Sequence, residues 1–462
     1  MQAEARQWHG VISEAGGLIV ALLLPLWFNP WQQPAFEPAK ILLFRSIVAI
    51  MATAALTSWM IERRSRYPNG TMVAPRFARW RARNPLFWPA LAFVAAHLLA
   101  TVVAVKPTLS LWGRPDNPQG LLTTLCTVAF FLLLTAGLGT QAQFERMVTA
   151  LILGSVPVVV YGLSQFVGLD PLPWITDSVS PVLSTMGRSN FLGAYLAMVI
   201  PFTLLRIADE RAGRRRARYG IVLALQVLCL WLTLARAAWL GFLAGALLFL
   251  GLLAQRRRSR TLWGLAVVVM IFGVSLYAAM NVTALPRWGR PTTETHSGSG
   301  MLFADLRAAS VNARLTIWMT TLGLVRERWL LGYGPEQFPA VFAAHYPPEL
   351  TRFEGPQVVV DDPHNLFLDQ LMAAGVVGLA ALLGVLIGFY RVALAAWRRC
   401  RDWHGENALA ALMAAATAFV VQAQFNPDVI VLSALFWLVL ALGVAWYARL
   451  GALNPKEVML SR

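Results

Sequence analysis

Long apolar stretches recur along the chain at the length of a membrane-spanning helix. A bilayer core needs about 20 mostly apolar residues per helix, and about twelve stretches approach that length. They lie near 12–29, 39–61, 86–105, 119–139, 147–168, 189–205, 219–234, 237–254, 262–280, 364–388, 408–425 and 429–448. We therefore predict an all-α polytopic membrane protein with about twelve transmembrane helices.

The composition supports this class. Of 462 residues, 57% are apolar and only 13% are charged, whereas soluble domains carry about 25% charged residues. The three cysteines are Cys126, Cys229 and Cys400, and none of them forms a CxxC pair. This spacing argues against a disulfide framework and against a thiolate metal site.

Lysine and arginine gather in alternate loops. The four basic loops are 62–85, 206–218, 255–261 and 389–407, with seven, six, four and four of these residues. By contrast, 30–38 and 426–428 contain none. Basic loops face the cytoplasm, so we expect both termini to be cytoplasmic. The net charge of +16 is then a topological signal, and no nucleic-acid partner is expected.

One long segment, 281–363, differs from the other loops. It carries seven Lys or Arg and eight Asp or Glu, so it is nearly neutral, and we place it outside the cytoplasm. The chain then divides into 1–280 with helices one to nine, this loop with amphipathic helices, and 364–462 with helices ten to twelve and a cytoplasmic tail. Within the loop, 291–300 (PTTETHSGSG) has the composition of a mobile segment.

Two helices are predicted inside 281–363. One helix should end near Gly332 and pack on the membrane domain through apolar residues spaced four and three apart. These residues are Val311, Leu315, Trp318, Leu322, Val325 and Trp329. A second, short helix should start at Pro335, because proline suits a first helical turn. It carries Phe338, Val341 and Phe342 toward His345 and Tyr346.

Two arginines near the outer face are candidates to bind an anion. Arg236 lies in LTLARAAWLGF, where two spans meet with almost no loop. Arg314 lies on the amphipathic helix, four residues before Trp318. A guanidinium binds phosphate oxygens through two parallel hydrogen bonds. The alternatives are an Arg236 side chain that reaches lipid headgroups and an Arg314 side chain that is simply solvated.

A histidine precedes the tenth span in the string Asp361-Asp362-Pro363-His364-Asn365. Asp362 as N-cap and Pro363 as first helical residue fit a helix start, which places His364 in the first turn. The helix dipole there disfavours imidazolium, so we expect a neutral ring that can accept a proton. The alternative is a histidine that is only hydrogen-bonded to a neighbour.

Other titratable residues are assigned to packing or to loops. His97 lies within a span and is predicted to pack there, whereas His9, His296 and His404 are predicted to lie in loops. Arg45 lies one to two turns into the second span. We expect it to face the bundle and to pair with a group that the sequence does not identify.

The motifs of common soluble enzymes are missing. The sequence contains no P-loop, GxSxG, HExxH, dinucleotide fingerprint or DxD motif. The adjacent carboxylates Asp361 and Asp362 diverge too far to chelate one ion well. We therefore predict neither a metal site nor an organic cofactor.

Several segments resemble the O-antigen ligase/Wzy polymerase superfamily. LTLARAAWLG matches its arginine-containing span motif, and NARLTIWMTTLGLVRERWLLGYGPEQF matches its R-x-x-x-W helix followed by G-x-G. PHNLFLDQLMAAGVVGL matches its histidine–asparagine motif. The segments SLWGRPDNPQGLLT and STMGRSNFLGAYLAMVIP are also similar to the family. The resemblance extends from about residue 100 to 445, in the family's order.

The resemblance implies a membrane glycosyltransferase of the GT-C fold in the bacterial inner membrane. Its donor would be an undecaprenyl-diphosphate-linked glycan on the periplasmic face. Arg236 and Arg314 would hold the diphosphate, and His364 would act as the general base on an acceptor hydroxyl, with Arg188 and Asn365 as secondary candidates. The transfer would be metal-independent and inverting, and lipid A core is the expected acceptor.

Other functions stay open. Ala235 precedes Arg236 where the family often has serine, which leaves the acceptor uncertain, so a Wzy-type polymerase or a protein O-oligosaccharyltransferase are alternatives. A secondary transporter is an alternative of another class. It would show matching halves and spans interrupted by glycine or proline near the midplane, and we expect neither from this sequence.

Overall fold

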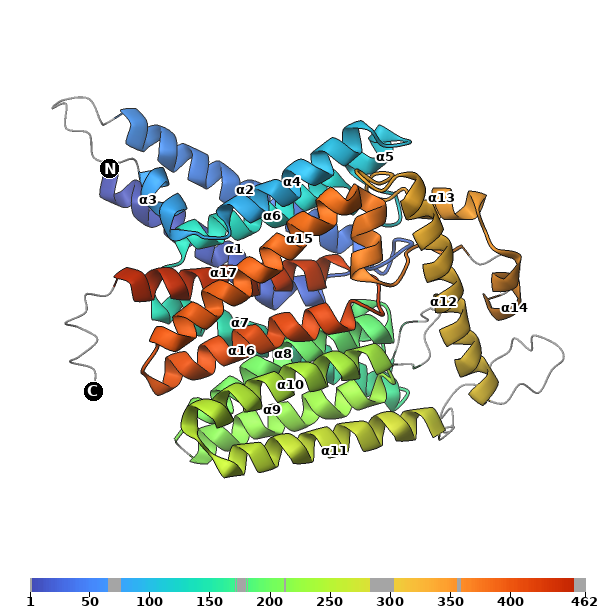
Figure 1. The fold of residues 1–462 in the computed structure, drawn as a ribbon. Helices are drawn as coiled ribbons and strands as arrows, with labels where there is room; N and C mark the ends of the chain where they lie inside the picture. The colour runs from blue at the N-terminus through green and yellow to red at the C-terminus, as the bar shows by residue number, and fades with distance from the viewer. Residues whose placement is uncertain are drawn as a thin grey trace.

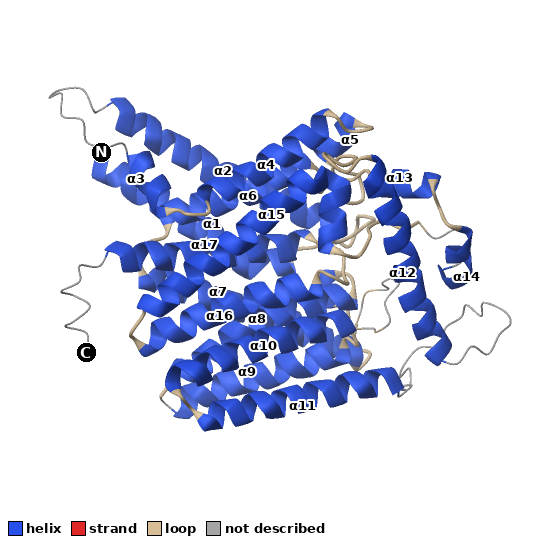
Figure 2. Ribbon diagram, in the orientation of Figure 1, coloured by secondary structure: helices blue, strands red, loops and turns tan. Residues whose placement is uncertain are grey.

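The computed structural model describes residues 2–64, 76–170, 172, 180, 182–211, 213–282, 303–354 and 359–452. Across these residues the regular elements are all helices (Figure 2). The long helices run side by side as a bundle, and one helix crosses the end of that bundle (Figure 1).

Each predicted span coincides with a helix of the bundle. These helices are α1 (Gln2–Leu23), α2 (Glu37–Arg64), α4 (Phe87–Val102), α6 (Leu121–Gly137), α7 (Gln141–Phe166), α8 (Ser189–Asp209), α9 (Gly213–Leu232), α10 (Arg236–Arg257), α11 (Arg260–Val282), α15 (Leu366–Arg399), α16 (Trp403–Gln422) and α17 (Ile430–Ala452). The short connecting elements are η1 (Leu24–Leu26), α3 (Arg76–Arg83), α5 (Pro107–Trp112) and η2 (Ser184–Met186).

Length and apolar composition qualify many of these helices as membrane spans. Within the described residues, seven helices are long and apolar enough to cross a bilayer: α2, α7, α8, α10, α15, α16 and α17. Shorter apolar helices lie in α1 with η1, α4, α6 and α11. The prediction of an all-helical polytopic membrane protein is therefore confirmed. The count of twelve spans and the GT-C fold stay predictions.

Small residues pack the centre of the bundle. A Cβ added to Gly241 of α10 would lie 2.6 Å from the carbonyl oxygen of Ala418 in α16. A Cβ on Gly193 of α8 would lie 2.8 Å from the Cβ of Ala238 in α10. Small side chains let helix backbones approach closely in membranes. This close packing places the first turns of α8 and α10 beside the last turns of α16.

The helix ends define two ends of the bundle. At one end the last turns of α8, α10 and α15 contain arginines, and we call it the arginine-rich end. The helix α1 begins and α17 ends there too (Figure 1). We call the opposite end, where α8 and α10 begin, the His364 end. The two termini of the bundle therefore share one end, as the loop charges predict.

The segment after α11 folds over the His364 end. It contains α12 (Phe303–Glu327), α13 (Phe338–Ala344), η3 (Pro348–Leu350) and α14 (Thr351–Glu354), and α12 runs across the ends of the bundle helices (Figure 1). The predicted second helix is present, although it starts at Phe338 and not at Pro335. Its residues Phe338, Val341 and Phe342 are buried. The segment 291–300 lies outside the described residues.

The prediction of which face of α12 is buried is mostly wrong. Val311, Leu315, Leu322 and the downstream Trp329 are 42% to 59% exposed, and only Trp318 and Val325 of the predicted set pack against the local core. The buried face is instead formed by Ala313, Ile317, Thr321 and Leu324. Both faces are apolar, and the second fits against the aromatic side chains of α13 and against Leu350. The helix also ends at Glu327, five residues before Gly332.

The helix α15 is interrupted near its start. Ala374 and Gly375 leave the helical conformation, and Gly375 has a φ of 62°. The segment that follows α12 satisfies the backbone groups around this break. Three backbone hydrogen bonds replace those that a continuous helix would form. Val376 N donates to Trp329 O (2.8 Å), Val377 N donates to Leu330 O (3.4 Å), and Tyr333 N donates to Met372 O (2.7 Å).

The sequence predicts no span interrupted by glycine or proline near the midplane, and the break in α15 lies near the start of the helix, at Ala374 and Gly375. Glycine tolerates a positive φ, and the 329–333 segment satisfies the backbone groups that the break would leave unpaired, so an interrupted helix is stable here. Transporters use unwound backbone carbonyls of broken helices to bind ions. In α15 the Met372 carbonyl is already bound by an amide of the protein.

We expect the Gly375→Ala variant to be destabilised by about 2–4 kcal/mol, because a left-handed φ and overpacking both penalise a side chain. A Cβ there would lie 2.5 Å from the backbone nitrogen of Leu331. Thermal unfolding in detergent measures this effect. Gly323→Ala in α12 is the control, because a Cβ at Gly323 meets nothing within 4 Å. Equal melting temperatures for the two variants would contradict the close packing of Gly375 against the 329–333 segment.

Candidate functional site

His364 lies just before α15 and not inside it. The N-cap of α15 is Asn365, whose side-chain oxygen accepts from Phe367 N (3.0 Å) and Leu368 N (3.1 Å). The prediction that Asp362 caps this helix is therefore wrong. The Asp362 side chain instead accepts from His364 N at 2.5 Å, in the local turn that aspartate favours. The dipole argument for His364 as a first-turn residue no longer applies.

The His364 segment is anchored on the end of α16. Leu366 N donates to Ala423 O at 2.8 Å, and the Asn365 side-chain amide donates to Gln424 O at 3.3 Å. Asn365 therefore both caps α15 and ties it to α16. His364 is half-buried beside this contact, and its Nδ1 lies 3.5 Å from Asp362 Oδ1.

The helix α12 also contacts this segment. The indole N–H of Trp318 donates to the carbonyl of Pro363 at 2.9 Å. The Trp318 ring also faces Phe425, with 6.3 Å between the ring centres. Arg314 lies one turn earlier on α12 and is half-buried. The helix that carries Arg314 is therefore bonded to the residue before His364.

Arg236 lies at the tight turn that the sequence predicts. It is the first residue of α10, after a short turn in which Leu234 has a φ of 55°, and its side chain is half-buried. A cation at the start of a helix meets the positive end of the helix dipole. An anion bound at this point would be attracted by both the guanidinium and the helix end.

Arg188 lies at the N-cap position of α8, and its side chain is exposed. Two residues later, Asn190 donates to Asn426 at 3.5 Å, and Asn426 donates to Gln422 of α16 at 3.0 Å. The start of α8 is thus joined to the same helix end that anchors Asn365.

The structure therefore gathers the candidate residues at one end of the bundle. Arg188 and Arg236 begin α8 and α10, while Arg314 lies on α12 across that end (Figure 1). His364 and Asn365 lie between α12 and the end of α16. Four separate segments supply these residues.

Arg45 binds the loop 113–120 and the helix residues on either side of it. Its guanidinium donates to Pro118 O at 2.6 Å, to Thr123 Oγ1 at 2.7 Å and to Trp112 O at 3.3 Å. The prediction that Arg45 faces the bundle and pairs there is confirmed. From the same loop, the side chain of Gln119 donates to Asp428 O at 3.1 Å, so Arg45 fixes a loop that reaches the connection before α17.

The sequence motifs did not identify a buried lysine, Lys40. The ammonium of Lys40 donates to Trp27 O at 2.5 Å and to Thr185 O at 2.7 Å. Lys40 is fully buried, and it holds the η2 segment that leads into Arg188. Its position at the start of an apolar span could have indicated this role, because a charged side chain in a membrane has a high free-energy cost unless it is bound by partners.

Several carboxylates surround the His364 segment. Burial and the nearby carboxylates Asp362, Asp116 and Asp361 raise the pKa of Glu336 to about 8, although Arg114, 3.3 Å away, opposes this shift. Burial also raises the pKa of Asp428 to about 7. Among the described residues, no group of three or more His, Cys, Asp or Glu is placed to hold a metal ion.

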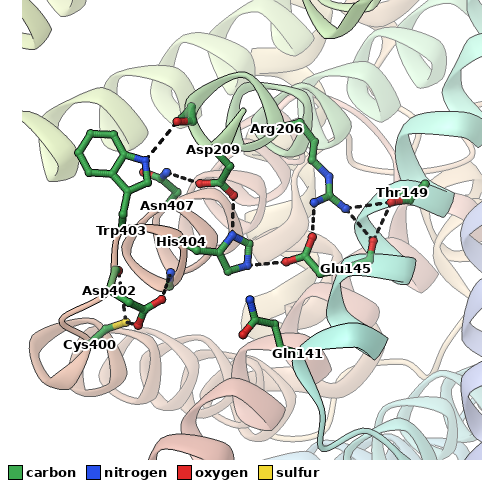
Figure 3. A network of polar contacts seen from close by, with 12 residues as sticks. Gln141, Glu145, Thr149, Arg206, Asp209, Cys400, Asp402, Trp403, His404 and Asn407 are labelled. Carbon is green, nitrogen blue, oxygen red and sulfur yellow. Dashed lines mark hydrogen bonds and ion pairs between the residues drawn. The ribbon is translucent and has the colours of Figure 1, made fainter. Parts of the chain in front are cut away.

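His404 was predicted in a loop, but it lies in the first turn of α16 and joins a polar network at the arginine-rich end (Figure 3). Its two ring nitrogens each lie 2.5 Å from a carboxylate oxygen, one of Glu145 and one of Asp209. Arg206 binds Glu145, and Asn407 donates to Asp209 at 2.5 Å. This network lies at the opposite end of the bundle from His364, so it is not part of the candidate site.

Comparison with known families agrees with the sequence motifs. Residues 220–383 match the family described as O-antigen ligase. The matched region includes Arg236, Arg314, His364 and Asn365, whereas Arg188 lies outside it. The match confirms the superfamily that the motifs predict. No curated protein matches the chain significantly.

We expect Glu336→Gln to change the pH dependence of stability. A carboxyl whose pKa is raised on folding stabilises the protein most at low pH, and this contribution is lost as the pH rises from about 4.5 to about 8. The amide cannot ionise, so the melting temperature of the variant should fall less than that of the wild type between pH 5 and 9. Differential scanning fluorimetry across this range tests the expectation. Glu349→Gln, at an exposed position, is the control, and parallel curves for wild type and Glu336→Gln would contradict it.

Proposed function

Since this chain contains an O-antigen ligase domain of the O-antigen ligase/Wzy superfamily at residues 220–383, we propose that it is a membrane glycosyltransferase. It transfers a glycan from undecaprenyl diphosphate to an acceptor hydroxyl. The observation that carries this proposal is the gathering of Arg188, Arg236, Arg314 and His364 at one end of the bundle.

The arginines are proposed to bind the diphosphate of the donor. Arg236 combines a guanidinium with the N-terminus of α10, and both favour an anion. Arg314 lies on α12, four residues before Trp318, which binds the carbonyl of Pro363. Neutralising the charge of the diphosphate makes it a better leaving group. Arg188 and Asn365 are secondary: Arg188 adds positive charge, and Asn365 holds the histidine segment in place.

His364 is proposed as the general base. With a proton on Nδ1, the ring would point that proton toward Asp362 Oδ1, 3.5 Å away, and Nε2 would be free to accept another. Nε2 takes the proton of the acceptor hydroxyl while the oxygen of that hydroxyl bonds to the anomeric carbon of the donor glycan. The bond from that carbon to the phosphate oxygen breaks, and undecaprenyl diphosphate leaves. Attack from the opposite face inverts the anomeric centre.

The proposed location follows from the charge of the loops. The arginine-rich end would face the cytoplasm, so the His364 end would face the periplasm of a bacterial inner membrane. Lipid-linked donors would reach the site from the outer leaflet. We propose a GT-C fold and lipid A core as the acceptor. A growing glycan, as for a Wzy-type polymerase, and a protein are the alternative acceptors.

In-vitro transfer from purified undecaprenyl-diphosphate glycan tests this function. Lipid A core, free glycan and a protein acceptor are supplied in parallel, with a chelator present. We expect transfer to one acceptor to survive the chelator. His364→Ala should lower turnover by about a hundredfold or more because the general base is lost. Arg236→Ala should lower it by about a hundredfold because stabilisation of the leaving diphosphate is lost.

Two variants outside the proposed site serve as controls. His345→Ala removes a histidine of the same segment, and Arg326→Ala removes an exposed arginine of α12. Both should transfer at wild-type rates. Transfer that persists in His364→Ala would remove the proposed base. A folded protein that does not bind the donor would favour the secondary transporter.

A further inference from the structure

We propose that Trp318 is a positioning residue that holds His364 in its working conformation. The inference rests on the proposed role of His364 as general base. It concerns the indole N–H of Trp318, which donates to the carbonyl of Pro363 at 2.9 Å.

The carbonyl of Pro363 and the N–H of His364 belong to one planar peptide group. Trp318 binds the carbonyl end of this group, and the side chain of Asp362 binds the N–H end at 2.5 Å. The peptide plane is therefore held at both ends. Its orientation determines where the backbone of His364 points.

The backbone of His364 needs such support. Its φ is 55°, in the left-handed region that is disfavoured for residues other than glycine. Strained residues persist where the surrounding structure fixes them. Without the bond from Trp318, the peptide group can rotate and His364 can relax to a negative φ. The imidazole would then move away from the acceptor hydroxyl.

Trp318 also connects the base to the proposed donor site. Arg314 and Trp318 are four residues apart on α12, so they lie on the same face of the helix. The helix that would bind the diphosphate through Arg314 thus also fixes the peptide group before His364. This arrangement keeps the leaving group and the base in a constant relative position.

The variant Trp318→Phe keeps an aromatic ring and removes the N–H donor. We expect its turnover to fall about tenfold, because a small displacement of a base is costly, while the donor concentration at half-maximal rate stays within about twofold. Phe425→Leu removes the ring contact with Trp318 and keeps the N–H, so its turnover should stay near wild type. Trp329→Phe, at an exposed tryptophan on the segment that follows α12, is the matched control.

The same substitution in a His364→Ala background separates positioning from general structural support. If Trp318 acts through His364, Trp318→Phe should lower the residual rate no further. Initial rates over a range of donor concentrations and thermal unfolding are measured for each variant. Phe425→Leu keeps the test decisive if Trp318→Phe does not fold, because loss of turnover in this variant would assign Trp318 to packing.

The possible failures are distinguishable. Normal transfer by His364→Ala overturns the proposed function itself. Loss of transfer in His364→Ala together with wild-type turnover in Trp318→Phe overturns only the role of Trp318. An equal effect of Trp318→Phe with and without His364, or a change confined to the donor half-saturation, also overturns it.

Discussion

Backbone groups that leave a helix within a membrane protein have to find partners inside the protein, and this constraint shapes the whole His364 end. The break in α15 is stable because the 329–333 segment binds its free amides. The start of the same helix is bonded to the end of α16 through Leu366 N and Ala423 O. The unpaired backbone groups of each irregular segment are therefore hydrogen-bonded to another segment. These hydrogen bonds hold the candidate site together.

One buried cation, Lys40, and one partly buried cation, Arg45, follow the same rule. Arg45 binds two carbonyl oxygens and a threonine hydroxyl, and Lys40 binds two carbonyl oxygens. These oxygens replace part of the hydration that both cations lose, and the carboxylate of Glu37 also interacts with Lys40. By contrast, Glu336 and Asp428 are crowded by other acids, and burial raises the pKa of both.

The sequence predicted the positions of the helices well because an apolar run of about 20 residues has few other uses. It also predicted the hairpin at Arg236 and the inward direction of Arg45. It failed where a choice depended on tertiary contacts. Both Asp362 and Asn365 suit an N-cap, and only the fold decides which oxygen meets the free amides. The two apolar faces of α12 could not be ranked, since burial depends on the neighbour that each face meets. The loop assignment of His404 failed because its partners Glu145 and Asp209 are far away in the sequence.

The ion pairs at the arginine-rich end make the charge of this end different during membrane insertion and after folding. If the arginine-rich end faces the cytoplasm as proposed, arginines such as Arg206 and Arg256 act on orientation during insertion, before any tertiary partner exists, and acidic residues contribute little. In the folded protein Arg206 is bound to Glu145, and Arg256 lies 2.7 Å from Glu406. The charge that orients the nascent chain is thus partly neutralised once folding is complete. The mature protein presents a weaker positive field to anionic lipids than its loop sequences indicate.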